Sequence, residues 1–138
     1  MNVPRVKEID WETSESIATV VGARVGECVA NVLRAFLDHP DILPKDSVFV
    51  EGLYRLGGQL GLHTWIETAV SVIDPTIVRQ PNYLLHERIA HYKIIVRTDD
   101  EIMRLYGSAD RAPRTALRMK LSWSDPGVDE LAHIVDPP

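Results

Sequence analysis

The amino-acid sequence predicts an α+β fold, in which a helix that carries the lone cysteine packs against an antiparallel β-sheet. Two observations predict this class. Apolar residues recur at three-and-four spacing over residues 27–38, the period of an amphipathic helix. Strand-like apolar runs occupy residues 47–56, 61–74 and 91–97, and glycines or prolines separate these runs.

Length and composition indicate one globular domain. The chain has 138 residues, of which 45% are apolar and 25% charged, typical of a globular protein with one core. We expect a core at about residues 11–107 and a C-terminal extension at 108–138. The net charge of −5, without a basic stripe, argues against a nucleic-acid partner. Neither a membrane span nor an apolar signal core is found, so we expect a cytoplasmic protein without membrane association.

The helix at 27–38 has clear boundaries in the sequence. Gly26 marks its entry, Glu27 suits the positive end of the helix dipole, and Pro40 ends the segment. Residues 1–10 are expected to be an extended lead-in. Residues 11–22 are ambiguous, because Thr13 or Ser14 could cap a helix whereas the β-branched run that follows disfavours one.

The second half of the chain contains a further helix signal. Thr98 followed by acidic residues predicts a short helix that Gly107 closes. A short helix after Pro81 and a strand over residues 114–123 are also compatible with the sequence. The last ten residues are expected to be poorly ordered unless they dock onto the domain.

Cys28 is the one cysteine of the chain, which excludes an internal disulfide and a multi-cysteine metal site. The predicted helix places it in the first turn. There the positive end of the dipole lowers a thiol pKa, and free backbone N–H groups can hold an oxyanion. The other interpretation is a small buried apolar residue, since Cys28 lies one turn before Val32.

The segment GLHTWIETAVSVIDPT contains two titratable residues that a buried strand would normally avoid. In a strand, His63, Trp65 and Glu67 share one face. A symmetric reversal at Thr68–Ala69 would place His63 opposite Asp74, with Cβ atoms about 4.5–5.5 Å apart. The carboxylate would then orient the imidazole. A loop of odd length would break this register, and an aspartate before proline is also common in turns.

Four pieces in this order carry a resemblance: GECVAN (26–31), VFVEGLY (48–54), LHTWIE (62–67) and VIDPT (72–76). Together they resemble the transglutaminase-like (papain-like) superfamily of cysteine enzymes. They are similar in particular to small bacterial and phage proteins with a Cys-x-x-Asn helix, a VEG strand, a His-x-Trp strand and an Asp-Pro-Thr strand end. The resemblance covers residues 26–76 and implies a papain-like core. Thr64 departs from the pattern, where alanine is usual.

The resemblance implies Cys28 as nucleophile, His63 as general base and then acid, and Asp74 as the orienting carboxylate. It also suggests Asn31 as a lining or oxyanion residue, although an ordinary exposed helix residue is an equal interpretation. Trp65 is expected to pack beneath the site in preference to contacting substrate. The implied activity is cysteine-dependent acyl transfer, by a peptidase, amidase, deamidase or acyltransferase acting on a protein, peptide or small amide.

Other functions remain open in the sequence. A non-catalytic binding or effector protein could keep the same fold with Cys28 merely buried. A zinc site at Cys28, His63 and Asp74 is a minor option, because closed zinc sites usually hold more thiolate or imidazole. His86 and His91 have the wrong spacing for two ligands on one helix face. We therefore expect no metal and no cofactor, and the oligomeric state is not fixed.

Overall fold

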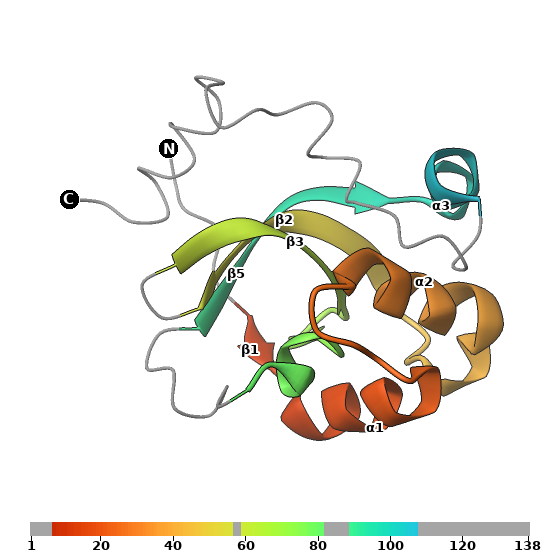
Figure 1. The fold of residues 1–138 in the computed structure, drawn as a ribbon. Helices are drawn as coiled ribbons and strands as arrows, with labels where there is room; N and C mark the ends of the chain where they lie inside the picture. The colour runs from red at the N-terminus through yellow and green to blue at the C-terminus, as the bar shows by residue number, and fades with distance from the viewer. Residues whose placement is uncertain (1–6, 57–58, 82–88, 108–138) are drawn as a thin grey trace.

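The computed structural model describes residues 7–56, 59–81 and 89–107, which form an α+β fold with three helices and a curled five-stranded sheet (Figure 1). The helices are α1 (Trp11–Val21), α2 (Cys28–Asp38) and α3 (Asp99–Tyr106). The strands are β1 (Glu8–Ile9), β2 (Val48–Leu56), β3 (Gln59–Glu67), β4 (Ser71–Ile73) and β5 (Ile89–Arg97). Two short 3-10 turns, η1 (Pro40–Ile42) and η2 (Ile77–Arg79), complete the described elements. The predicted α+β class is confirmed.

The sheet has the strand order β1-β4-β3-β2-β5. Strand β2 is antiparallel to both β3 and β5, and β3 is antiparallel to β4. Strand β1, however, pairs in parallel with β4, with Glu8 opposite Ser71. The prediction of a purely antiparallel sheet is therefore wrong at this edge. The intervening helices and strands supply the long connection that two parallel strands need.

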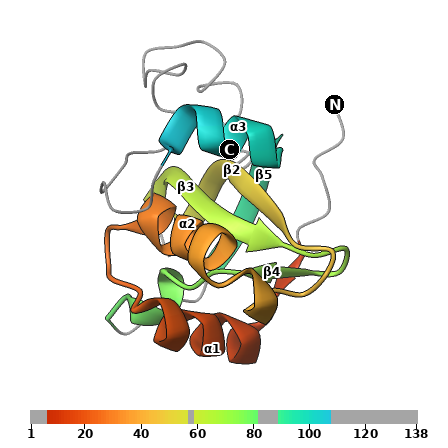
Figure 2. The ribbon, with the colours of Figure 1, turned by 90° about the vertical axis from the view of Figure 1, so that its right-hand side faces the viewer.

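One face of the sheet carries the main hydrophobic core. Figure 2 shows α2 lying in front of β3, with α1 and α3 to either side of it. Residues from all three helices pack there against the sheet residues Phe49, Ile66 and Ile73. Side chains alternate along a strand, so Trp65 points to the opposite face and packs with Val50 and Val72 in a second cluster.

Helix α1 resolves the ambiguity at residues 11–22. Its N-cap is Asp10, whose carboxylate accepts hydrogen bonds from the backbone N–H and hydroxyl of Thr13. Gly22, at φ 65°, ends the helix. Burial of Ile17 and Val21 against the core favours the helix and outweighs the lower helix propensity of the β-branched residues.

The two other helices follow their sequence signals. Helix α2 begins at Cys28, one residue after the predicted start, and Glu27 is its N-cap. The predicted Thr98 cap of α3 is confirmed, and Glu101 completes a capping box by accepting the Thr98 backbone N–H. The helix predicted after Pro81, the strand predicted at 114–123 and the C-terminal extension lie outside the described residues.

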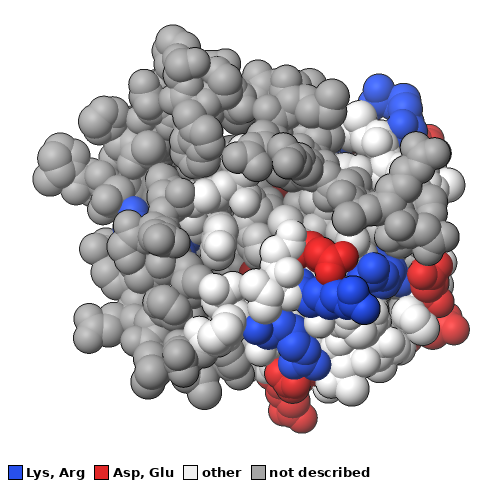
Figure 3. Space-filling model, in the orientation of Figure 1, with Lys and Arg blue, Asp and Glu red and all other residues white. Residues whose placement is uncertain are grey.

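The described surface mixes charges of both signs. Figure 3 shows basic and acidic side chains next to each other on the described part of one face. Ion pairs such as Arg79–Glu15, at 2.7 Å, account for such neighbours. Within the described residues, no helix is long and apolar enough to cross a membrane.

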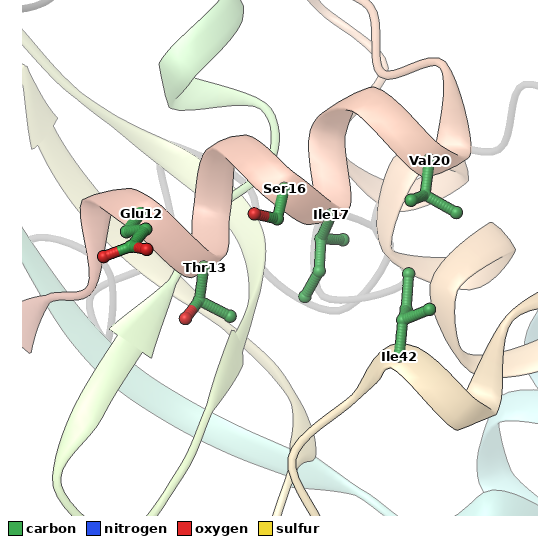
Figure 4. A pocket seen from close by; sticks show the side chains of 6 residues that line it. All are labelled: Glu12, Thr13, Ser16, Ile17, Val20 and Ile42. Atoms are coloured by element: carbon green, nitrogen blue, oxygen red, sulfur yellow. The ribbon is translucent and has the colours of Figure 1, made fainter.

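A pocket of about 250 Å³ lies between α1 and η1 (Figure 4). The apolar side chains of Ile17, Val20 and Ile42 line it together with three polar residues of α1: Glu12, Thr13 and Ser16. None of the predicted site residues lines this pocket.

Gly52 marks a close approach between three strands. A Cβ atom there would lie 2.2 Å from the Tyr92 carbonyl oxygen and 2.8 Å from a ring carbon of Trp65. We expect Gly52→Ala to lower the free energy of unfolding by about 3 kcal/mol, because a backbone atom must move. Urea unfolding measures this loss.

Gly61→Ala is the matched control for this substitution. Its Cβ would lie 3.4 Å from the ring of Tyr54, a side chain that can adjust. We expect a loss of about 1 kcal/mol or less. Equal stability of the two variants would contradict the close approach at Gly52.

Candidate active site

Cys28 is the first residue of α2 and is half-buried. Within β3, the described pairing with β4 covers only Ile66 and Glu67, so the preceding part of β3 has β2 as its one described strand neighbour. The start of α2 lies against this open part of β3. The backbone of Thr64 interacts with Cys28 and lowers the pKa of its thiol. The helix and the strand thus hold the thiol between them.

The hairpin of β3 and β4 brings His63 and Asp74 together, but in a register that differs from the predicted one. Ile66 pairs with Ile73 and Glu67 with Val72, so the chain reverses at Ala69–Val70 and not at Thr68–Ala69. The Thr68 hydroxyl oxygen accepts hydrogen bonds from the backbone N–H groups of Val70 and Ser71. This side-chain turn replaces the positive-φ residues on which tight hairpins usually depend.

Asp74 is consequently a diagonal neighbour of His63 and not its direct counterpart. The carboxylate nevertheless reaches the imidazole, with 2.7 Å between Asp74 Oδ2 and His63 Nε2. Strand β4 ends at Ile73, which frees Asp74 to turn toward the ring. The predicted contact is present although the predicted pairing was wrong.

Asp74 is completely buried and accepts four hydrogen bonds. Its Oδ1 accepts the backbone N–H groups of Thr76 and Ile77, at 3.1 Å each. Its Oδ2 accepts from His63 and from a second histidine, His91, also at 2.7 Å. A buried carboxylate is tolerated when its lone pairs are occupied in this way, so the residues after β4 fix an ionised aspartate.

His63 links the carboxylate to the thiol. Because its Nε2 faces Asp74, its other ring nitrogen, Nδ1, is the one left to hydrogen bond with Cys28. The ring of Tyr54 stacks on the imidazole at 4.2 Å between centroids and holds its plane. His63 is only 5% exposed. The order thiol, imidazole, carboxylate is therefore present in space.

Electrostatics favour an ion pair between Cys28 and His63. Burial alone would raise the pKa of the Cys28 thiol, but the hydrogen bond and charge of His63, together with the Thr64 backbone, lower it below its ordinary value. Burial likewise acts to lower the pKa of His63. The charge of Asp74 and its hydrogen bond outweigh burial and hold the His63 pKa well above its ordinary value.

The carboxylate itself stays ionised. Burial acts to raise the pKa of Asp74, but His63 and His91 lower it far below its ordinary range. The site can therefore hold a thiolate, an imidazolium and a carboxylate in line. This is the charge pattern of an activated cysteine nucleophile.

Asn31 lies in the site region but has other partners. It is fully buried, and its Nδ2 donates to the Arg24 carbonyl at 2.8 Å and to the Thr76 hydroxyl at 2.9 Å. Both amide protons of Asn31 are thus used in these bonds. None is left to bind an oxyanion, the role that the resemblance suggested. Asn31 is also not an exposed helix residue. It ties the loop before Cys28 to the loop after Asp74.

We expect Asn31→Ala to lower the free energy of unfolding by about 2 kcal/mol, because it removes these bonds from a buried position. Thr76→Val, which removes one of them, should cost about 1 kcal/mol. Thermal or urea unfolding gives both values. Full stability of Asn31→Ala combined with a large loss of Cys28 reactivity toward esters would instead indicate an oxyanion role.

Trp65 packs beneath the site, as expected. It has no exposed surface, its Nε1 donates to Glu67 Oε2 at 2.9 Å, and its ring meets the His91 ring edge-on at 4.9 Å. A substrate cannot reach it in this arrangement. The sequence offered Trp65 as a packing or substrate residue, and the geometry gives it the first role.

Glu51 of the VEG piece is also structural. It is fully buried on β2 and accepts hydrogen bonds from Arg97 Nε, at 2.5 Å, and from the hydroxyl of Tyr106. It therefore joins β2 to β5 and α3, on the strand face opposite His63.

His91 is the site residue that sequence reasoning missed. Its position opposite Tyr54 depends on the pairing of β2 with β5, which shifts register between Glu51 and Gly52. No local pattern marks such a shift. The weak available signal was a histidine within an otherwise strand-like apolar run.

His63, Asp74 and His91 together offer three donor atoms within 4.8 Å of one another. Both imidazole nitrogens, however, stand 2.7 Å from the same carboxylate oxygen. Ligands on a tetrahedral zinc at about 2.0–2.1 Å would be about 3.3 Å apart. The present spacing is that of hydrogen bonds with protons between the atoms. Cys28, on the other side of the His63 ring, could not join such an ion without rearrangement.

Comparisons with protein-family models, with curated proteins and with solved structures gave no match for this chain. The site is therefore interpreted from its own geometry.

Proposed function

We propose that this protein is a cysteine-dependent acyl-transfer enzyme that uses Cys28, His63 and Asp74. One observation carries the proposal: His63 Nε2 lies 2.7 Å from the buried carboxylate of Asp74, and the same ring interacts with the Cys28 thiol at the start of α2. In this proposal the imidazole activates the thiol and the carboxylate orients the imidazole. The half-burial of Cys28 leaves part of the residue accessible to a substrate.

In the proposed reaction the Cys28 thiolate attacks the carbonyl carbon of an amide or ester, and the carbonyl oxygen becomes an oxyanion. The His63 imidazolium then gives its proton to the leaving amine or alcohol, which departs as an acyl-enzyme thioester forms. A water or an amine next loses a proton to His63 and attacks the thioester. Collapse of this second intermediate releases the acyl product and restores the thiolate and imidazolium.

The start of α2 supplies donors for the oxyanion. The first backbone hydrogen bond into α2 comes from Asn31 N to Glu27 O, at 2.8 Å. The N–H groups of the preceding helix residues therefore have no partner within the helix. In this proposal the Cys28 backbone N–H is the nearest of them to the reacting carbon.

The fold assignment belongs to the same proposal. We propose that the cysteine on a helix start, the histidine on a following strand and the aspartate at the end of the next correspond to a papain-like, transglutaminase-like core. The support is the contact of α2 with β3 and the hairpin that joins His63 to Asp74. On this basis we expect a protein, peptide or small amide as substrate.

Intact-mass measurement after mixing with p-nitrophenyl acetate tests the proposal. We expect one acetyl group on the wild-type protein within minutes at pH 7, located on Cys28 by peptide mapping. Cys28→Ser should not be labelled, and His63→Ala should be labelled at least about 10-fold more slowly. Wild-type labelling no faster than that of His63→Ala would support a non-catalytic binding protein instead.

A further inference from the structure

The geometry points to His91 as a positioning residue that shares the Asp74 carboxylate with His63 and thereby limits the basicity of His63. The inference rests on the proposed function for its biological meaning. The three buried side chains involved are His63, Asp74 and His91, and their interaction can be tested without a catalytic assay.

The contacts of His91 place it at the same carboxylate oxygen as the proposed catalytic histidine. His91 Nε2 and His63 Nε2 each lie 2.7 Å from Asp74 Oδ2. The His91 side chain has no exposed surface. The edge of its ring faces Trp65, and it lies next to Tyr54 on the neighbouring strand. It does not face Cys28 in any described contact, so it acts through Asp74.

The protonation state of His91 follows from its surroundings. Asp74 is ionised and can only accept, so His91 Nε2 must carry a proton. The other nitrogen, His91 Nδ1, is buried and has no hydrogen-bond partner in the described part of the chain. A proton there would create a buried, unpaired N–H on a charged ring. We therefore assign the Nε2 proton of His91 as the one that Asp74 Oδ2 accepts.

A second N–H donor on Oδ2 has a definite effect on His63. Each hydrogen bond to a carboxylate stabilises its negative charge and reduces its attraction for other protons. With His91 in place, Asp74 holds the His63 imidazolium less strongly than it would alone. This matters for catalysis, because an acid that binds its proton too tightly transfers it slowly to the leaving group.

The charged and titratable groups around His63 come from every neighbouring element. Cys28 of α2 and Asp74 after β4 contact it directly, Tyr54 of β2 stacks on it, and His91 of β5 lies beyond the carboxylate. Farther along the same face of β3, Glu67 is paired with Lys7 and lies 3.9 Å from Lys93. Only His91 among these acts on Asp74 in competition with His63.

The test compares His91→Phe with His91→Gln, both in the Cys28→Ser background. Phenylalanine fills the ring space without a donor, whereas glutamine carries an N–H donor as many bonds from its Cα as imidazole Nε2. An NMR titration of the His63 ring protons measures its pKa in each protein. We expect His91→Phe to raise that pKa by about half a unit to one unit, and His91→Gln to leave it nearly unchanged.

Equal His63 pKa values in the two variants, or a lower value in His91→Phe, would overturn the inference. Such a result would leave the proposed function untouched, since that is tested by acylation of Cys28. Nitrogen-15 spectra of the Cys28→Ser protein, with His91 intact, give a second readout that does not depend on how the variants fold. The inference requires a proton on His91 Nε2, and a ring protonated on Nδ1 alone would contradict it.

Discussion

At pH 6 the wild-type protein is expected to react with iodoacetamide about 10-fold faster than the His63→Ala variant. An ordinary thiol with a pKa of about 8.5 is only about 0.3% thiolate at this pH, whereas the contacts of His63 lower the pKa of Cys28 and so raise its thiolate fraction. The weaker nucleophilicity of a low-pKa thiolate offsets part of this gain in thiolate. About 10-fold remains as the expected ratio of rate constants.

The controls for this prediction use the same reagent. Cys28→Ser has no thiol and should not be modified, because the chain contains one cysteine. Wild-type protein unfolded in urea should react at the slow rate of an ordinary thiol. The ratio of wild-type to His63→Ala rates should fall as the pH rises above about 8.5, where both thiols are ionised. A ratio near one at pH 6 would mean that His63 does not activate Cys28.

Asp74→Ala is expected to cause the largest loss of stability in the site, about 3–5 kcal/mol of the free energy of unfolding. The substitution leaves His63, His91 and two backbone N–H groups without their shared acceptor in a buried position. Urea unfolding at pH 6 measures the loss. Asp46→Ala is the matched control, since its carboxylate accepts one exposed backbone N–H, from Ala69, and its removal should cost about 1 kcal/mol or less.

The pH dependence of stability gives this prediction a second part. The folded-state pKa of Asp74 is depressed, so its contribution is present above its unfolded pKa of about 3.9 and is lost as the pH falls. The folded-state pKa of His63 is raised, so its contribution is complete below about pH 6.5 and is lost as the pH rises through the folded-state value. The difference between wild type and Asp74→Ala should therefore shrink below about pH 4. A difference that is constant from pH 3 to pH 6 would contradict an ionised Asp74.

Local sequence signals were enough for most elements of the fold. The apolar period at residues 27–38 and the Thr98 cap mark α2 and α3, because both depend on neighbours within four residues. The parallel pairing of β1 with β4 was not predictable in this way. It joins residues about sixty positions apart, and a strand of two residues has no periodicity to detect.

In the candidate site, too, features that depend on distant parts of the chain were not predictable from local sequence. The predicted site residues were Cys28, His63 and Asp74, and the structure brings these three residues together. The register was not predicted, because the Thr68 side chain forms the turn and shifts it by one residue. His91 was missed because its place depends on a register shift in β2. The burial of Asn31 was not predicted, because its partners, Arg24 and Thr76, meet only in the folded chain.

The central claim is that Cys28 exists as a thiolate paired with a protonated His63 at neutral pH. Thiolate absorbance near about 240 nm, taken as the difference between wild type and Cys28→Ser across pH, measures this state directly. We predict a signal that persists well below pH 8.5 in the wild type and moves up to about that pH in His63→Ala. A wild-type signal that appears only near pH 8.5 or above, and does not change in His63→Ala, would contradict the ion pair.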